Sequence, residues 1–379
     1  MSNQDRFTVI IDAARSPIGV KNGKLVGIRA DDLAAQVIKG LLERNPKFPK
    51  AKIEDVVLGC AFPEASQGML IARGVLVLAG IPEQAGAKVV NRFCGSSMDA
   101  VHQVDRAILV GDIEAGIGGG VEDMFSIPMG GFNPSLNPKL AEMQFYMGMG
   151  ETAENLAKDG NISREAQDKF AVDSHEKALD ALKNNRFEKE IIPIQVNGTI
   201  VKQDEGPRQP DLEKIKSLAP AFLKDGSVTA ATSSPFSMGA SAMLLASNEM
   251  ALELDLQPKA KIVARAFAGV DWKRMGMGPI PATEKALKRA GMTINDIDVI
   301  ELNEAFAAQS IYVIEKAGWP MDKVNLNGGA IALGHPLGCS GARILTTLLN
   351  VMEQKKARTG LATMCIGGGQ GIATIIERV

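Results

Sequence analysis

The stretch FCGSS at residues 93–97 opens a predicted helix, and GIGGG follows it at residues 116–120. The same order returns later in the chain, where GCSGA at residues 338–342 opens a helix and CIGGG follows at residues 365–369. Self-similarity of this kind is the sequence mark of an internal repeat. The four stretches therefore predict two similar halves.

The repeat extends upstream, because KIEDVVL at residues 52–58 resembles IDVIEL at residues 297–302 in order and kind. Corresponding positions in the two halves are separated by nearly the same number of residues. The separation is 243 from Val56 to Val299, 245 from Cys94 to Cys339 and 249 from Gly118 to Gly367. We predict duplication of one α/β unit. The alternative is chance likeness among glycine-rich turns.

Strand-like and helix-like runs alternate in the first half. Residues 7–11 and 56–59 are predicted strands, whereas residues 31–43 carry apolar side chains at a 3.6-residue period and residues 71–79 form another predicted helix. This alternation is typical of an α/β protein with a largely parallel sheet that helices cover on both faces.

Residues 122–239 differ in texture from the two halves. They contain two Asn-Pro steps, many Met residues, a charged helix near residues 163–184 with a good N-cap, and a polar ribbon or loop at residues 199–209. An insertion of this length is expected to form a lid or binding subdomain. We assign residues 1–255 to an N-terminal half that contains this loop domain, and residues 256–379 to a C-terminal half.

The composition is that of a soluble globular protein. The 379 residues include 42 Lys and Arg against 44 Asp and Glu, and a net charge of −2 gives no whole-chain attraction to nucleic acid or to an anionic membrane. No run approaches the roughly 18 uncharged apolar residues of a membrane span, and the N-terminus does not resemble a signal peptide. The four cysteines form no C-x-x-C pair, so we predict no metal site and a reducing, cytoplasmic location.

Cys94 lies where a predicted strand at residues 87–90 gives way to the helix opened by Gly95. A helix N-terminus carries about +0.5 charge and free N–H groups, which favour a thiolate over a thiol. This position predicts a nucleophile. The alternative is a small buried hydrophobic residue, which is the usual role of an isolated cysteine.

His335 stands between a glycine and a proline, which hold it in a defined turn outside a regular helix. The other two histidines, His102 and His175, fall in helical patterns where a structural role suffices. A metal pair of His335 with Cys339 is disfavoured, because the intervening proline and glycine oppose a shared helical face. A base for a cysteine nucleophile is the better interpretation.

Two further positions end predicted strands. Cys365 comes just before the glycines at residues 367–369, whose N–H groups can point at a developing anion. A dinucleotide-binding turn is disfavoured there, because no clear helix follows. Asn303 ends the strand near residues 297–302, where its amide can donate a hydrogen bond or hold a water, the alternative being an ordinary helix cap.

Together these stretches form one specific pattern, namely NRFCGSS at residues 91–97, NEAF at 303–306, the run from NGGA to GHPLGCSG at 327–341, and CIGGG at 365–369. Over essentially its whole length the chain resembles the thiolase family, and in particular the bacterial 3-ketoacyl-CoA thiolases of fatty-acid β-oxidation. The resemblance implies a five-layered αβαβα fold of two similar halves, with a loop domain inserted in the first half.

The resemblance also implies roles for the site residues. Cys94 resembles the nucleophile that takes the acyl group as a thioester, and His335 resembles the base that activates it. Cys365 resembles the second acid/base. Asn303 resembles the residue that holds a water in one oxyanion hole with His335, and the backbone N–H groups of Cys94 and Gly367 resemble the other hole.

The resemblance further implies a set of substrate-binding residues. Met149 and Met275 match positions that line the acyl pocket, Phe306 is a further substrate-binding residue, and Ser234 remains available to contact the pantetheine amide. The chain departs from the family pattern in one loop. At this loop, family members often have the sequence Thr-Ala-Gly-Asn-Ser-Ser, followed further on by Asp-Gly-Ala. Here the stretch is TAATSS and Met238 stands before the glycine, which leaves the loop's detailed shape and the chain-length preference open.

We therefore predict an acyltransferase that cleaves 3-ketoacyl-CoA with CoA, gives acetyl-CoA and a shortened acyl-CoA, and needs no cofactor. A homodimer or tetramer is expected, with a β-oxidation multienzyme subunit as a further partner. The alternatives are a biosynthetic acetoacetyl-CoA thiolase, a decarboxylating ketoacyl synthase and a non-catalytic CoA- or lipid-binding protein. The synthase is expected to have His at the position of Cys365, and the non-catalytic protein is expected to have lost Cys94, His335 or Cys365.

Overall fold

The computed structural model describes residues 6–379 as one α/β molecule built on a ten-stranded sheet. The main strand order is β10-β11-β12-β9-β1-β8-β5-β3-β4, and β2 pairs with β8. The strands are β1 (Thr8–Arg15), β2 (Gly19–Val20), β3 (Asp55–Gly59), β4 (Gly86–Val90), β5 (Ala115–Asp123), β8 (Ser237–Ser247), β9 (Ala260–Gly269), β10 (Val299–Leu302), β11 (Thr359–Ile366) and β12 (Gln370–Arg378).

The sheet is mixed, so the expectation of a largely parallel sheet is wrong. Only β3 with β4, β3 with β5 and β10 with β11 run parallel, while the remaining pairs in this sheet are antiparallel. The reason is that β11 and β12 form a tight hairpin, and that β8 enters the sheet between β1 and β5 after the long excursion of the loop domain. Alternation along the sequence does not reveal either event.

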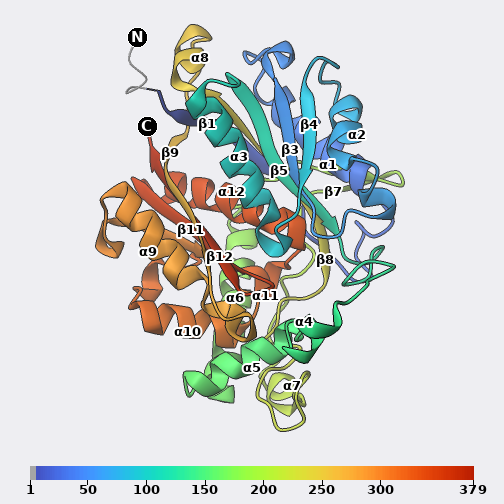
Figure 1. Cartoon of the computed structure of the whole chain (residues 1–379), viewed down its shortest axis with the longest axis vertical. Helices are drawn as coiled ribbons and strands as arrows, with labels where there is room; N and C mark the ends of the chain where they lie inside the picture. Colours follow the sequence, from blue (N-terminus) through green and yellow to red (C-terminus); the bar gives the residue numbers. More distant parts are fainter. Residues whose placement is uncertain (1–5) are drawn as a thin grey trace.

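Helices cover the two halves of the sheet and also separate them (Figure 1). On one outer face lie α1 (Ala30–Glu43) and α2 (Ile71–Leu78), and on the other lie α9 (Pro279–Ala290) and α10 (Ala307–Ala317). Between the halves lie α3 (Ser96–Val110) and α12 (Leu337–Lys355). The order of outer helices, strands, central helices, strands and outer helices confirms the predicted five-layered fold (Figure 1), and three apolar cores pack these layers together.

Local sequence explains the outer helix α1, which begins at Ala30 and was predicted over residues 31–43. Leu33, Val37 and Leu41 recur on one face and are buried against the strands of the first half. Burying such side chains stabilises the fold by about 1.5–3 kcal/mol each.

The two central helices approach each other unusually closely. A Cβ atom on Gly341 of α12 would lie 2.5 Å from the backbone nitrogen of Met98 on α3, so only glycine fits there. The Ser97 hydroxyl accepts a 2.9 Å hydrogen bond from the backbone N–H of Ala342 across the same contact. The small residues of the two repeated stretches therefore let the N-terminal ends of both helices meet.

The chain leaves the core after β5 and returns at β8. The intervening segment forms α4 (Pro138–Glu142), α5 (Met149–Asp159), α6 (Arg164–Lys183), the β6 (Ile194–Val196) and β7 (Thr199–Val201) hairpin, and α7 (Leu212–Ser217). Helices α4, α5 and α7 lie together at one end of the molecule (Figure 1). The predicted cap of the charged helix is confirmed, since the Ser163 hydroxyl accepts from the Ala166 N–H at 3.2 Å.

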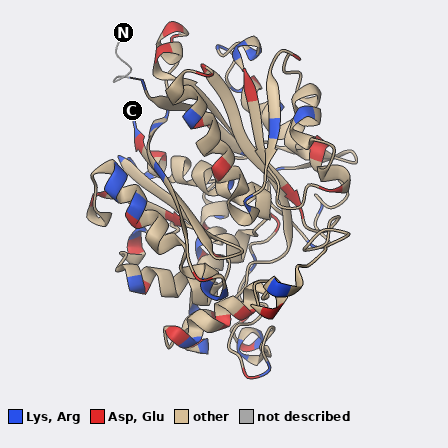
Figure 2. Cartoon of the chain, viewed as in Figure 1, with Lys and Arg blue, Asp and Glu red and all other residues tan. Residues whose placement is uncertain are grey.

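Charged residues of both signs are spread along the chain from residue 6 to residue 379. Figure 2 shows Lys and Arg interspersed with Asp and Glu over the helices and loops, in line with the net charge of −2. In residues 6–379, no helix combines the length and apolarity that crossing a bilayer requires.

Candidate active site

Cys94 lies in a short turn, Phe93–Gly95, between β4 and α3. Phe93 adopts a left-handed backbone conformation with φ of 43°, and the Ser96 hydroxyl fixes the turn. That hydroxyl accepts from the Arg92 N–H at 2.9 Å and donates to the Phe93 carbonyl at 2.6 Å. The sulfur of Cys94 is held at the end of the central layer, and the residue is only 9% exposed.

Cys365 comes to the same place from the C-terminal half, at the end of β11. Gly368 and Gly369 have φ of 78° and 80° and turn the chain into β12. The backbone N–H groups of Gly367, in this turn, and of Cys94 itself act on the sulfur of Cys94 and lower the pKa of its thiol. The structure thus brings Cys94, Cys365 and Gly367 close enough together to influence the ionisation of the two thiols.

Burial controls the ionisation of Cys94. It raises the pKa of the Cys94 thiol to about 11, and the nearby Glu122 charge acts in the same direction, whereas the two N–H groups lower this pKa. The expectation that the helix N-terminus favours a thiolate is therefore wrong for this resting site. Desolvation penalises the charged form and outweighs the backbone dipoles.

His335 immediately precedes Pro336, the N-cap of α12, and is 5% exposed. Its Nδ1 lies 2.6 Å from the Ser340 hydroxyl, and its Nε2 lies 3.4 Å from Nδ2 of Asn303. Burial lowers the pKa of His335 to about 3, and the positive charge of Arg343 adds to this effect. The imidazole is therefore neutral at pH 7. It can accept a proton only when negative charge forms nearby at the same time and stabilises the resulting imidazolium.

Asn303 joins His335 from the C-terminal half of the sheet. Its backbone N–H donates to the Thr363 carbonyl at 3.1 Å. Asn303 therefore lies beside strand β11, at the level of Thr363, which is two residues before Cys365 in that strand. The side-chain Oδ1 is buried and has no hydrogen-bond partner within residues 6–379. A buried unsatisfied amide oxygen is costly, which makes it a place where a water or substrate atom is expected.

The predicted substrate-binding residues lie around the second cysteine. Met275, Phe306 and Cys365 belong to one buried apolar cluster, and Met149 packs against it. Ser234 is half-buried at the rim, where its N–H donates to the Ala305 carbonyl at 3.0 Å. The structure therefore places the predicted acyl-pocket residues in one region.

Two buried carboxylates that sequence reasoning missed support the site. Glu122, at the end of β5, accepts hydrogen bonds of 2.7–3.2 Å from the side chain of Gln67 and from the backbone N–H groups of Ala61, Phe62 and Gly338. Glu304 accepts bonds of 2.6–3.2 Å from Ser174, Asn325 and the N–H of Ile331. The signal was present, because each carboxylate sits inside or beside one of the quoted stretches.

Phe145 is a further residue that sequence reasoning missed. A Cβ atom on Gly368 would lie 3.5 Å from the tip of the Phe145 ring, and that ring contacts Trp272 with centroids 6.0 Å apart. The loop domain thus places an aromatic side chain over the glycine turn that follows Cys365.

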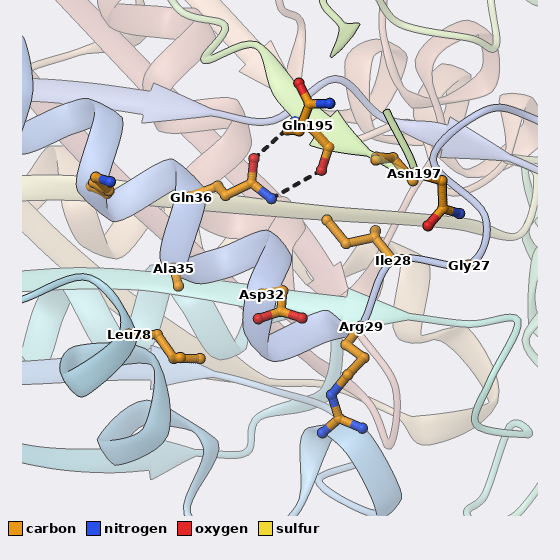
Figure 3. A pocket seen from close by; sticks show the side chains of 11 residues that line it. Gly27, Ile28, Arg29, Asp32, Ala35, Gln36, Leu78, Gln195 and Asn197 are labelled. Carbon is orange, nitrogen blue, oxygen red and sulfur yellow. Dashed lines mark hydrogen bonds between the residues drawn. The ribbon is translucent and has the colours of Figure 1, made fainter. Parts of the chain in front are cut away.

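A separate pocket opens between α1 and the turn of the β6–β7 hairpin (Figure 3). The Gln36 side chain spans it by hydrogen bonds of 2.8 and 3.2 Å to the backbone of Gln195. None of the predicted site residues lines this pocket. It is therefore distinct from the cysteine site.

Comparisons with known proteins agree with the geometry. Residues 8–249 match the model of the thiolase N-terminal domain and residues 256–378 that of the thiolase C-terminal domain. The chain is 52% identical to a 3-ketoacyl-CoA thiolase of Marinomonas sp. (strain MWYL1), with 98% of each chain covered. It is 51% identical to a 3-ketoacyl-CoA thiolase of Vibrio parahaemolyticus, with 100% of each chain covered.

A solved structure is similar in three dimensions. The crystal structure of the Bacillus anthracis acetyl-CoA acetyltransferase superposes with a TM-score of 0.91 at 35% identity, and the match covers 100% of both chains. The whole fold, the loop domain included, is therefore shared with a known protein.

The ionisation of the site predicts how the reactivity of Cys94 depends on pH. A thiol with a pKa of about 11 is protonated at neutral pH, so its thiolate fraction rises about tenfold per pH unit between roughly pH 7 and pH 10. We expect the rate of iodoacetamide alkylation at Cys94, followed by peptide mass spectrometry, to rise with that slope. Cys94→Ser controls for peptide assignment, and a rate that is flat across this range would contradict a neutral resting site.

Proposed function

This chain belongs to the thiolase family, and we propose that it is an acetyl-CoA C-acyltransferase that cleaves 3-ketoacyl-CoA with CoA. The products are acetyl-CoA and an acyl-CoA shortened by two carbons. The observation that carries the proposal is the convergence on one point of the Cys94 sulfur, the Gly367 N–H and Cys365. A nucleophile, an anion-binding donor and a second proton carrier are the parts that a covalent acyl transfer needs.

The first half-reaction breaks the carbon–carbon bond. The Cys94 thiol gives its proton to Nε2 of His335 while the sulfur attacks the keto carbon of the substrate. The bond between that carbon and C2 breaks, and its electron pair passes into the enolate of acetyl-CoA. The Cys365 thiol protonates this enolate at C2, so that acetyl-CoA leaves and the acyl group remains on Cys94 as a thioester.

The second half-reaction returns the acyl group to CoA. The Cys365 thiolate takes the proton of the incoming CoA thiol, whose sulfur attacks the thioester carbon. Collapse of the tetrahedral adduct expels the Cys94 sulfur, which takes its proton back from His335. Both cysteines and the histidine end in their starting protonation states, so the cycle needs no metal or organic cofactor.

Two sets of donors stabilise the negative oxygens that form in these steps. The N–H groups of Cys94 and Gly367 bind the oxyanion at the carbon attached to the nucleophile. The enolate oxygen lies near Asn303 and Nε2 of His335, whose nitrogen atoms are 3.4 Å apart. Loss of one such donor costs about 10²- to 10³-fold in rate.

The substrate lies between the apolar cluster and the rim. Met149, Met275 and Phe306 contact the acyl chain, and Ser234 contacts the pantetheine arm. Pro235 and Phe236, which follow Ser234, line a cavity whose wall also includes Lys21 and Arg208. These cations suit the phosphate groups of CoA.

The degradative direction is the one that the names of the similar relatives favour, and a biosynthetic acetoacetyl-CoA thiolase is the less favoured alternative. Retention of Cys94, His335 and Cys365 opposes a non-catalytic binding protein. We propose β-oxidation as the setting, with a 3-hydroxyacyl-CoA-oxidising enzyme as the supplier of substrate. Four free cysteines favour a reducing compartment such as the cytoplasm.

Exchanging each cysteine for serine separates the two proposed roles. Cys94→Ser is expected to lose more than about 10³-fold of the thiolysis rate, because an alkoxide is much harder to form than a thiolate. Cys365→Ser is expected to keep acylation of Cys94 by acyl-CoA but to lose exchange of the acetyl-CoA α-protons with deuterated solvent. Radiolabel transfer and NMR measure the two steps, and exchange at the wild-type rate in Cys365→Ser would show that another group carries this proton.

We also propose that the chain forms at least a dimer through the open edge of the sheet. Strand β4 ends the strand order, and helix α2 packs against it. Directly before α2, Met69 is 98% exposed and Leu70 is 51% exposed. Free strand edges with apolar neighbours favour pairing with a second copy. Phe93, 40% exposed, lies at this edge directly before the nucleophile.

Light scattering at micromolar concentration is expected to give at least twice the monomer mass of 40.2 kDa. The double change Met69→Glu, Leu70→Glu is expected to shift the mass toward that of the monomer. Leu252→Glu, at an apolar position that is 80% exposed on α8 (Asn248–Glu253), is the matched control and should leave the mass unchanged. A wild-type mass of 40.2 kDa would refute the proposal.

A further inference from the structure

Ser340 is a buried residue of α12 to which the proposed mechanism gives no role. Its hydroxyl oxygen lies 2.6 Å from Nδ1 of His335 and 2.8 Å from the carbonyl oxygen of Pro336. The residue is fully buried and His335 is 5% exposed, so bulk water does not compete for either contact. These two short contacts decide where the protons lie.

A serine hydroxyl has a single proton, and a carbonyl oxygen can only accept. The proton of Ser340 is therefore directed to Pro336. The same oxygen can then only accept from the imidazole, so Nδ1 of His335 must carry the ring proton. In a neutral imidazole the other nitrogen, Nε2, then carries a lone pair and no proton, so it acts as an acceptor.

The group on the other side of the ring agrees with this assignment. Nδ2 of Asn303 is a donor without acceptor capacity, and it lies 3.4 Å from Nε2 of His335. A protonated Nε2 would set two donors against each other. With the Asn303 amide oriented as it is, both neighbours of the ring therefore agree with the same tautomer.

We propose that Ser340 is a positioning residue that fixes the Nδ1–H tautomer of His335 and so makes Nε2 the atom that accepts the Cys94 proton. The inference rests on the proposed function, because that function makes His335 the base that takes the Cys94 proton. Ser340 contacts neither substrate nor sulfur in this account. It acts by accepting one hydrogen bond from the base and by holding the ring plane.

Loss of the hydroxyl is expected to weaken the base rather than the binding of substrate. In Ser340→Ala the Nδ1 proton has no acceptor, and the ring can move its proton to Nε2, where it cannot serve as a base. General-base catalysis contributes about 10²- to 10⁴-fold. We expect kcat of thiolysis to fall about 10- to 100-fold with KM changed less than about threefold, and we expect Ser340→Thr to recover part of the loss.

Thr346→Ala is the matched control. Thr346 is a buried hydroxyl residue on the same helix, and its hydroxyl also bonds a carbonyl, that of Ala342 at 2.8 Å. Its loss removes a comparable hydrogen bond from α12 without touching His335. We expect the kcat of this variant to stay within about threefold of the wild-type value.

The direct readout is the tautomer itself, measured on the wild-type enzyme with ¹⁵N-labelled histidine. Only three histidines occur in the chain, so long-range proton–nitrogen spectra can be assigned with His335→Gln. The expected spectrum has a protonated Nδ1 and an imine-type Nε2 for His335, and mixed signals in Ser340→Ala.

A proton on Nε2 in the wild-type protein would overturn the inference, as would an unchanged tautomer and kcat in a folded Ser340→Ala variant. The tautomer is read without turnover. A failure of the proposed function would instead appear as absent thiolysis by the wild-type enzyme, so the two failures are distinguishable.

Discussion

The contact between the N-terminal ends of α3 and α12 is the constraint on which the site depends. Each helix begins just after a proposed catalytic residue, Cys94 in one half and His335 in the other. Gly341 lets the backbones touch, and Glu122 ties the start of α12 to the loop after β3 through its bonds to the N–H groups of Gly338 and Ala61. Precise placement of reacting groups is worth several kcal/mol of a barrier. A shift of either helix would separate the proposed base from the nucleophile.

Burial is the second feature that shapes the chemistry. It raises the pKa of the Cys94 thiol to about 11 and lowers that of His335 to about 3, so the resting pair is neutral. Proton transfer between them becomes favourable only when negative charge moves onto the substrate oxygen, where fixed N–H groups receive it. The Cys94 thiol therefore stays protonated without substrate. The fixed N–H groups stabilise charge only when the reaction places it on the substrate oxygen.

Much of the fold follows from the sequence, because small-residue stretches and apolar periodicity are local signals. The repeated FCGSS and GCSGA stretches predicted two halves, and the period of Leu33, Val37 and Leu41 predicted α1. The direction of the strands did not follow, because the entry of β8 beside β1 is decided by contacts across more than two hundred residues. The roles of Ser340 and Glu122 also did not follow, because they depend on hydrogen bonds that only the folded chain forms. The pKa of Cys94 was misjudged for the same reason, since burial is a property of the fold.

The account stands on the claim that Cys94 carries the acyl group. Mixing the enzyme with a 3-ketoacyl-CoA in the absence of CoA, quenching in acid and mapping the adduct by mass spectrometry tests it directly. The account predicts about one acyl group per chain on the Cys94 peptide, the release of an equal amount of acetyl-CoA, and neither product in Cys94→Ala. An adduct on Cys365, or an adduct that persists in Cys94→Ala, would contradict it.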